Sequence, residues 1–199
     1  MCRKRKNRCI MKRLTVDAMN RLSDEELMRH IANDRHAAFD TLYSRYAKRA
    51  GGFFLRMLAY DREKAEDLVQ ELFVRVWTNR NTFKAGHSFR TWLYAMAYNL
   101  CKNEYRQETV HLAYSEECLK RGEETVEAFD KLENDERYRC LRRAIQALPQ
   151  EKRDVFLLHY DEELTIAEVS RITDTPEGTV KSRVYAALDI IRKEMDKLK

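Results

Sequence analysis

The stretch TPEGTVKSRVYAAL, residues 175–188, has the pattern of a two-sided helix. Thr175 followed by Pro176 suits an N-cap and a first helical position, because the N–H that proline lacks is not needed there. We therefore expect a helix that starts at about Pro176. At about 100° per residue, its apolar residues gather in one narrow stripe, which predicts a buried face. That stripe contains Val180, Val184, Leu188, Ile191 and Met195.

The opposite side of this helix carries small residues between cations. Gly178, Ser182 and Ala186 lie on it, Thr179 and Tyr185 lie beside them, and Lys181 and Arg183 project from the flanks. Such a face fits the major groove of DNA, where small side chains let a helix approach the base edges while hydroxyls and cations contact phosphates. The alternative is a small strip that packs on another helix.

The residues before this helix favour the DNA interpretation. The segment Ile166–Ile172 predicts a short helix, and only Thr173–Thr175 separates it from the next one, which is the spacing of a helix-turn-helix. In that arrangement Ser170 is the small residue at the crossing of the helices. Asp174 takes the turn position where a left-handed backbone is common, and Val180 anchors the second helix.

The rest of the chain also has helical patterning. Five Gly and two Pro in 199 residues, with 36% charged residues, favour helices over a sheet. We expect an all-α fold of two small helical domains joined by an acidic linker, the second containing the helix-turn-helix. The expected divisions are a disordered basic tail (1–22), a first domain (23–106), the linker (107–136) and the second domain (137–199).

Local signals predict four helices in the first domain. Ser23 and Glu26 have the capping-box spacing, so a short helix should start at Asp24. The other expected helices are Ala37 to about Leu58, weakened or kinked by Gly51 and Gly52, then Arg62–Thr78 behind Asp61 as a possible N-cap, and Phe89–Arg106. The segment 79–88 between the last two is rich in Asn, Gly and Ser and predicts a loop.

Charge and composition exclude several classes of protein. The first 13 residues hold seven basic residues and no acid, whereas residues 108–136 hold ten acids and three bases. The tail therefore suits a polyanion or solvent, and the middle of the chain would repel a phosphate backbone. The longest uncharged run, residues 91–101, is too short to span a membrane.

Neither catalysis nor a bound cofactor or metal is expected. The five glycines are scattered and form no phosphate-binding loop, and neither the G-x-S-x-G nor the H-E-x-x-H motif is present. The five cysteines, with no C-x-x-C pair among them, are read as free thiols in a reducing cytoplasm.

Taken together, the two halves resemble the extracytoplasmic-function (ECF) sigma factors of bacterial RNA polymerase. AEDLVQELFVRVW (65–77) and FRTWLYAMAYNL (89–100) are similar to that family's promoter-opening domain, and the 175–188 stretch is similar to its helix-turn-helix domain. The resemblance covers about residues 24–106 and 138–196 and implies a cytoplasmic sigma factor that binds core RNA polymerase and promoter DNA. The alternative function is a stand-alone helix-turn-helix regulator.

The resemblance also implies roles for individual residues. The polymerase-docking positions are Asp67, Gln70, Glu71 and Phe73. The minus-ten DNA positions are Arg75, Phe83, Gly86, His87, Ser88, Arg90, Met96, Tyr98, Asn99 and Lys102, with Arg106 as a further phosphate contact and Trp92 read as core. A base flipped out of the stack would be held there by an apolar wall and read by an amide.

The minus-thirty-five positions that the resemblance implies are Thr179, Lys181, Ser182, Arg183, Tyr185 and Ala186. Members of the family often carry Arg where this chain has Ala95, Tyr98 and Ala186, so its promoter sequence cannot be taken from a relative. The family also implies an anti-sigma partner, commonly membrane-anchored, while the chain itself is not expected to insert into a membrane.

Overall fold

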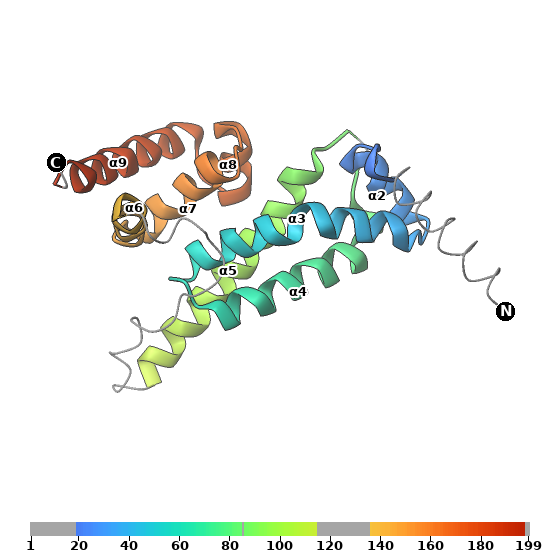
Figure 1. Cartoon of the computed structure of the whole chain (residues 1–199), viewed down its shortest axis with the longest axis horizontal. Helices are drawn as coiled ribbons and strands as arrows, with labels where there is room; N and C mark the ends of the chain where they lie inside the picture. The colour runs from blue at the N-terminus through green and yellow to red at the C-terminus, as the bar shows by residue number, and fades with distance from the viewer. Residues whose placement is uncertain (1–18, 85, 115–135, 198–199) are drawn as a thin grey trace.

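The structure, a computed structural model, describes residues 19–84, 86–114 and 136–197, and the regular elements in these ranges are all helices (Figure 1). The first domain contains α2 (Asp24–Ala32), α3 (His36–Met57), α4 (Arg62–Thr78), the short turn η1 (Arg80–Thr82) and α5 (Phe89–Tyr114). The second contains α6 (Glu136–Gln146), α7 (Gln150–Phe156), η2 (Leu157–Asp161), α8 (Ile166–Thr173) and α9 (Glu177–Asp196). The expected all-helical fold is confirmed.

The predicted caps start the first helices. At α2 the Glu26 backbone N–H donates to Ser23 Oγ at 3.1 Å, and the Ser23 N–H donates to Glu26 Oε2 at 2.9 Å, so the capping box is complete. At α4 the Lys64 N–H donates to Asp61 Oδ1 at 3.1 Å. These bonds satisfy backbone donors that have no partner within the helix, which fixes where each helix begins.

Helix α3 continues unbroken through its two glycines. A Cβ on Gly51 would lie 3.7 Å from Val69 of α4, so the glycine lets the two helices approach closely. A Cβ on Gly52 would lie 3.2 Å from the Arg56 guanidinium, which folds back over that position. Packing around the glycines thus offsets the weakness that glycine brings to a helix.

The helix-turn-helix has the predicted spacing, with a one-residue shift at its second helix. Asp174 adopts the left-handed conformation at φ 52°, and Ser170 Oγ donates to the Thr175 carbonyl at 2.6 Å. Pro176, not Thr175, is the N-cap of α9, because the Val180 N–H bonds to the Pro176 carbonyl. The Thr175 hydroxyl donates to the Thr173 carbonyl instead, at 3.2 Å.

The fourth predicted helix is longer than its pattern indicated. Helix α5 continues beyond Arg106 to Tyr114, into the segment expected to be linker, and α6 begins at Glu136. Residues 1–18 of the tail and most of the acidic run lie outside the described residues. Within the ranges that the structure does describe, no helix is both long and apolar enough to cross a membrane.

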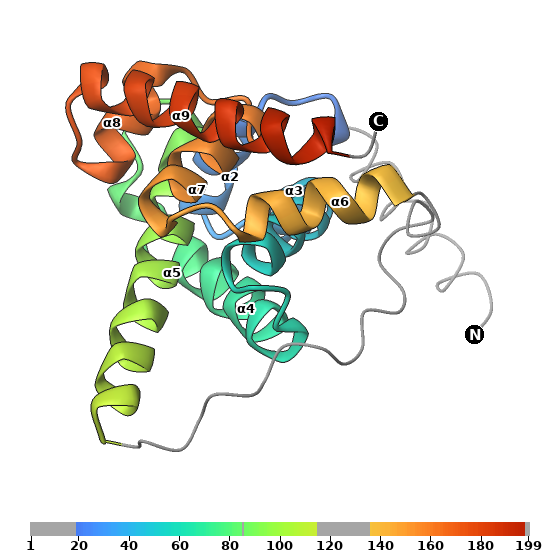
Figure 2. The same ribbon diagram turned by 90° about the vertical axis from the view of Figure 1, so that its left-hand side faces the viewer.

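The two domains pack against each other and share one hydrophobic core (Figures 1 and 2). Helix α8 contacts α5, and η2 contacts α3, so the second domain lies on the first. In Figure 2, α6 and α9 run side by side, with α9 above α6. The packed domains determine which of the candidate residues remain accessible.

Candidate nucleic-acid interface

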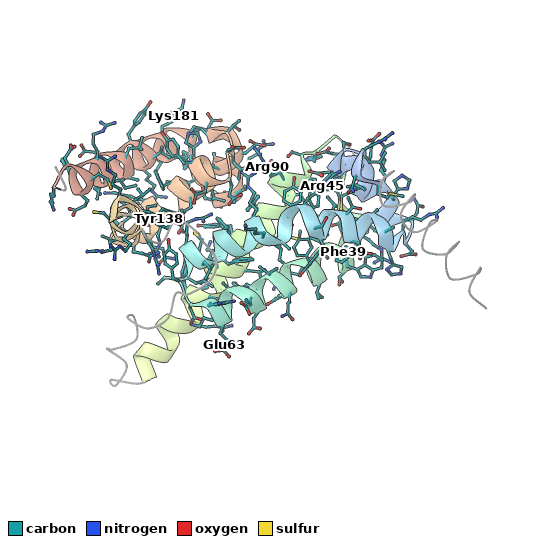
Figure 3. All side chains as sticks on the ribbon, viewed as in Figure 1. Phe39, Arg45, Glu63, Arg90, Tyr138 and Lys181 are labelled. Carbon is teal, nitrogen blue, oxygen red and sulfur yellow. The ribbon has the colours of Figure 1, made fainter. Side chains whose placement is uncertain are left out.

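Helix α9 presents the face that its sequence predicts. Val180 is fully buried, Val184, Ala187 and Ile191 are buried with it, and Leu188 and Met195 are half-buried. On the other side Thr179, Lys181 and Ser182 are exposed, and Tyr185 is 71% exposed. Lys181 lies on the outer side of the helix, away from the first domain (Figure 3). The core therefore holds α9 with its small, polar side toward solvent.

Two candidate residues of α9 are less accessible than the pattern suggests. Arg183 forms an ion pair with Glu151 of α7, and Ala186 is half-buried. The hydroxyl of Ser182 donates to the Thr179 carbonyl at 2.9 Å, which keeps its side chain close to the helix. Lys181 has no such partner among the described contacts, so the cations on the two flanks of this face differ in how they are held.

The loop before α5 combines an aromatic wall with exposed polar residues. The Phe83 ring packs edge-on against Trp92, with 5.4 Å between the ring centroids, and its centroid lies 6.3 Å from that of Phe89. Gly86 has φ 88°, a left-handed conformation that glycine adopts without strain, and His87 and Ser88 beside it are exposed. Half-buried Phe83 and Trp92 thus form an apolar wall beside accessible polar groups.

Helix α5 divides the remaining minus-ten candidates between two sides. Asn99 and Lys102 are exposed and Met96 is half-buried. Arg90 and Tyr98 face the second domain instead. The guanidinium of Arg90 donates to the Glu163 carbonyl at 2.8 Å, and Figure 3 places it at the junction of the domains. The expected minus-ten residues therefore form no continuous exposed surface in this arrangement.

Tyr98 faces a buried carboxyl group of the second domain. Burial raises the pKa of Asp154 to about 7, against the lowering effect of Arg153 and of the Tyr98 hydroxyl. Burial, followed by the nearby Asp154 charge, raises the pKa of Tyr98 to about 12. Both groups line a cavity of about 220 Å³ that Arg183 also reaches. The cavity therefore joins residues assigned to both promoter elements.

Helix α4 presents a mostly acidic and polar face on the side away from the core. Asp67, Gln70 and Glu71 are exposed, and Val74, which the sequence analysis did not single out, is 63% exposed among them. It lies four residues after Gln70 and three after Glu71, hence on the same side of the helix. By this position, Val74 lies within the candidate docking face.

Two other α4 residues have structural contacts in this arrangement. Phe73 is only 3% exposed and packs against Tyr43 at 4.7 Å between ring centroids, so it supports the docking face from beneath. Arg75 donates from Nε to Glu71 Oε1 at 3.0 Å. An arginine assigned to minus-ten phosphates thus lies beside a residue assigned to polymerase docking.

Comparisons with known proteins assign a family to each domain. The family model described as Sigma-70 region 2 matches residues 42–110, and the model described as Sigma-70, region 4 matches residues 138–190. These ranges contain α4, the following loop and most of α5 in one case, and α6–α8 with most of α9 in the other. Both candidate DNA-contacting faces fall within them.

Curated relatives resemble nearly the whole chain. The RNA polymerase sigma-H factor of Pseudomonas aeruginosa is 27% identical over 88% of this chain and 95% of its own length. The ECF RNA polymerase sigma-E factor of Haemophilus influenzae is 28% identical over 89% and 97%. For the ECF RNA polymerase sigma factor SigW of Bacillus subtilis the identity is 29%, over 79% and 89%.

Solved structures share the fold. The sigma factor RpoE of Bartonella quintana, in complex with the anti-sigma factor NepR, has a TM-score of 0.69 at 20% identity, covering 79% of this chain and 96% of that one. CnrH in complex with the cytosolic domain of CnrY has a TM-score of 0.62 at 19% identity, covering 87% and 97%.

Proposed function

This chain belongs to the extracytoplasmic-function sigma factors of the sigma-70 family, with region 2 in its first domain and region 4 in its second, and on that premise we propose the surfaces with which it works. It is a non-enzymatic factor that directs transcription initiation, using region 2 for the minus-ten element and region 4 for the minus-thirty-five element. A stand-alone helix-turn-helix regulator would leave the match over the first domain unexplained.

The outward face of α9 is the proposed minus-thirty-five reader. One observation carries this assignment: one side of α9 is buried in the core, and the opposite side is exposed at Thr179, Lys181, Ser182 and Tyr185. A helix held in this way can enter the major groove, with small residues toward the bases and Lys181 toward a phosphate. Arg183 joins this face once its pairing with Glu151 is exchanged for DNA.

The minus-ten pocket is proposed to lie between the 83–88 loop and α5. Phe83 and Met96 supply apolar surface for an unstacked base, and Asn99 supplies an amide to read its edge. Gly86, His87 and Ser88 form the exposed rim, and Lys102 and Arg106 lie on the exposed side of α5, where they suit phosphates of the separated strand. Three further residues join these DNA contacts once they exchange their present partners for DNA: Arg75 leaves Glu71, Arg90 leaves Glu163 and Tyr98 leaves Asp154.

Partners follow from the same premise. The α4 face of Asp67, Gln70, Glu71 and Val74 is the proposed docking surface for core RNA polymerase, positioned by Phe73 beneath it. An anti-sigma factor is the second proposed partner, supported by the related fold of RpoE, which was solved with the anti-sigma factor NepR bound. A membrane-spanning segment in the sequence of the captured anti-sigma factor would show that this partner is membrane-anchored.

Mapping of transcript starts tests the function as a whole. Purified chain plus core polymerase on genomic DNA should produce discrete 5′ ends that core polymerase alone does not produce. Sequences upstream of those ends would give the two promoter elements directly. A chain that binds core polymerase without creating any new start site would contradict the proposed function.

Asn99→Ala should reduce transcription from the mapped promoters by roughly 10–100-fold, because loss of one base-reading amide costs about 1–3 kcal/mol. The measurement is the initial rate of run-off transcription at limiting sigma factor. Asn103→Ala is the matched control, since Asn103 is an exposed amide one turn farther from the loop. Equal losses in both variants would remove Asn99 from the reading position.

A further inference from the structure

Three consecutive acidic residues of the second domain, Asp161–Glu163, form ion pairs with arginines of the first domain. Asp161 ends η2, and Glu162 and Glu163 follow it directly. Arg49 Nε donates to Glu162 Oε2 at 2.8 Å, and Arg49 also donates to the Asp161 carbonyl at 2.9 Å. Arg56, two turns later on α3, forms ion pairs with Asp161 and Glu162. The contacts between the domains are therefore strongly ionic here.

The centre of this contact is a buried carboxylate. The Glu162 side chain has no exposed surface, and burial raises its pKa while the Tyr94 hydroxyl, Arg49 and Arg56 oppose that rise. A charged group removed from water needs partners, so in the closed arrangement the Glu162 carboxylate depends on the two arginines that face it. Once the domains separate, both the acid and the arginines become available to solvent or to another charged partner.

The same contact extends onto the proposed minus-ten surface. Arg90 donates to the Glu163 carbonyl at 2.8 Å and lies 3.5 Å from the Glu163 carboxylate. The next residue on α5, Thr91, donates from its hydroxyl to Glu168 of α8 at 2.5 Å. Groups that would contact DNA or stand beside it are thus occupied by acids of the chain's own second domain.

We propose that the free chain holds itself closed through an acidic latch, Asp161–Glu163, which occupies Arg49, Arg56 and Arg90 of the first domain and covers part of its minus-ten surface at Arg90. Carboxylates and phosphates bind the guanidinium fork in similar ways, so the latch acts as an internal substitute for a nucleic-acid backbone. Promoter phosphates displace it when the domains separate. The covering of DNA contacts rests on the proposed function, whereas the closure itself does not.

Arg49→Glu should open the free chain, because it sets a carboxylate against buried Glu162. We expect its radius of gyration, measured by small-angle X-ray scattering, to rise by roughly 10–20% above that of a compact chain of this length. Asp161→Lys tests the latch from the other domain and should open the chain in the same direction, because it sets a cation against Arg56. Lys48→Glu is the matched control: the same change of charge at an exposed residue next to Arg49.

The nucleic-acid readout is binding to a mixed-sequence single-stranded oligonucleotide, followed by fluorescence anisotropy. If the open form is about one tenth of the free chain, opening variants should bind roughly tenfold more tightly. This gain is expected even for Arg49→Glu, which adds negative charge, and Lys48→Glu should bind no more tightly than the original chain. Circular dichroism establishes that each variant keeps its helices.

Scattering tests whether the latch closes the chain, and oligonucleotide binding tests whether the latch covers DNA contacts. Unchanged scattering in both Arg49→Glu and Asp161→Lys would overturn the latch. Expansion without tighter binding in either variant would overturn its covering role. Failure of the original chain to produce new transcript starts would count against the proposed function, while the scattering result would still decide whether the chain is closed. If Arg49→Glu does not fold, Asp161→Lys decides alone.

Discussion

Ser182→Glu is expected to abolish promoter-specific transcription, with a loss of at least about a hundredfold. Ser182 lies on the exposed, low side of α9, and a glutamate there would project a carboxylate toward the acceptor-rich groove and its phosphates. Each lost groove contact costs about 1–3 kcal/mol, and the repulsion adds to it. The measurement is run-off transcription from a mapped promoter with the chain bound to core polymerase.

Two control variants isolate the groove effect of Ser182→Glu. Ser182→Ala keeps the face small and removes only the local bond to the Thr179 carbonyl, so it should keep most activity. Ala147→Glu adds the same charge at an exposed residue just after α6 and should be nearly neutral. Binding to core polymerase should be equal in all three. Full transcription by Ser182→Glu would take Ser182 out of the interface.

Asp67→Lys is expected to weaken binding to core polymerase by roughly 10–100-fold, equivalent to about 1.4–2.7 kcal/mol. Asp67 is exposed on the same side of α4 as Val74, and reversing its charge would set a cation where the proposed partner surface accepts an acid. The affinity for core polymerase is measured in the absence of DNA, so that promoter contacts do not contribute.

Glu66→Lys is the control for this docking prediction. Glu66 is exposed on the same helix, about 100° away from Asp67, and pairs with Arg62 one turn earlier. Its reversal should change the affinity by less than about threefold, as for an exposed intrahelical pair. If Glu66→Lys weakens core binding as much as Asp67→Lys does, the effect is one of net charge and the assigned docking face is wrong.

Local sequence signals predicted most of the fold because they act within one turn. The Ser23–Glu26 box, the Asp61 cap and the left-handed Asp174 all depend on neighbours within a few residues, and each is in place. The prediction that Thr175 is the N-cap of α9 was wrong by one residue. The Thr175 carbonyl instead accepts a hydrogen bond from the Ser170 hydroxyl, five residues earlier. A pattern read along one helix does not contain that bond.

Contacts between the domains were not predictable from the pattern of either one. Arg49 looks like an ordinary exposed cation of α3 until its partner, 113 residues away along the chain, is known. Arg90 and Tyr98 were assigned to DNA by family resemblance, which describes the working complex and not the free chain. Val74 was missed because it lies in the apolar run LFVRVW, residues 72–77, where one apolar residue on the outer side does not stand out.

The burial of Glu162 has a consequence for the response to ionic strength. Dissolved ions screen exposed charges strongly and buried pairs weakly, whereas each phosphate contact to DNA loses affinity as salt rises. Raising the salt concentration should therefore weaken promoter binding more than it weakens the contact between the two domains at Glu162.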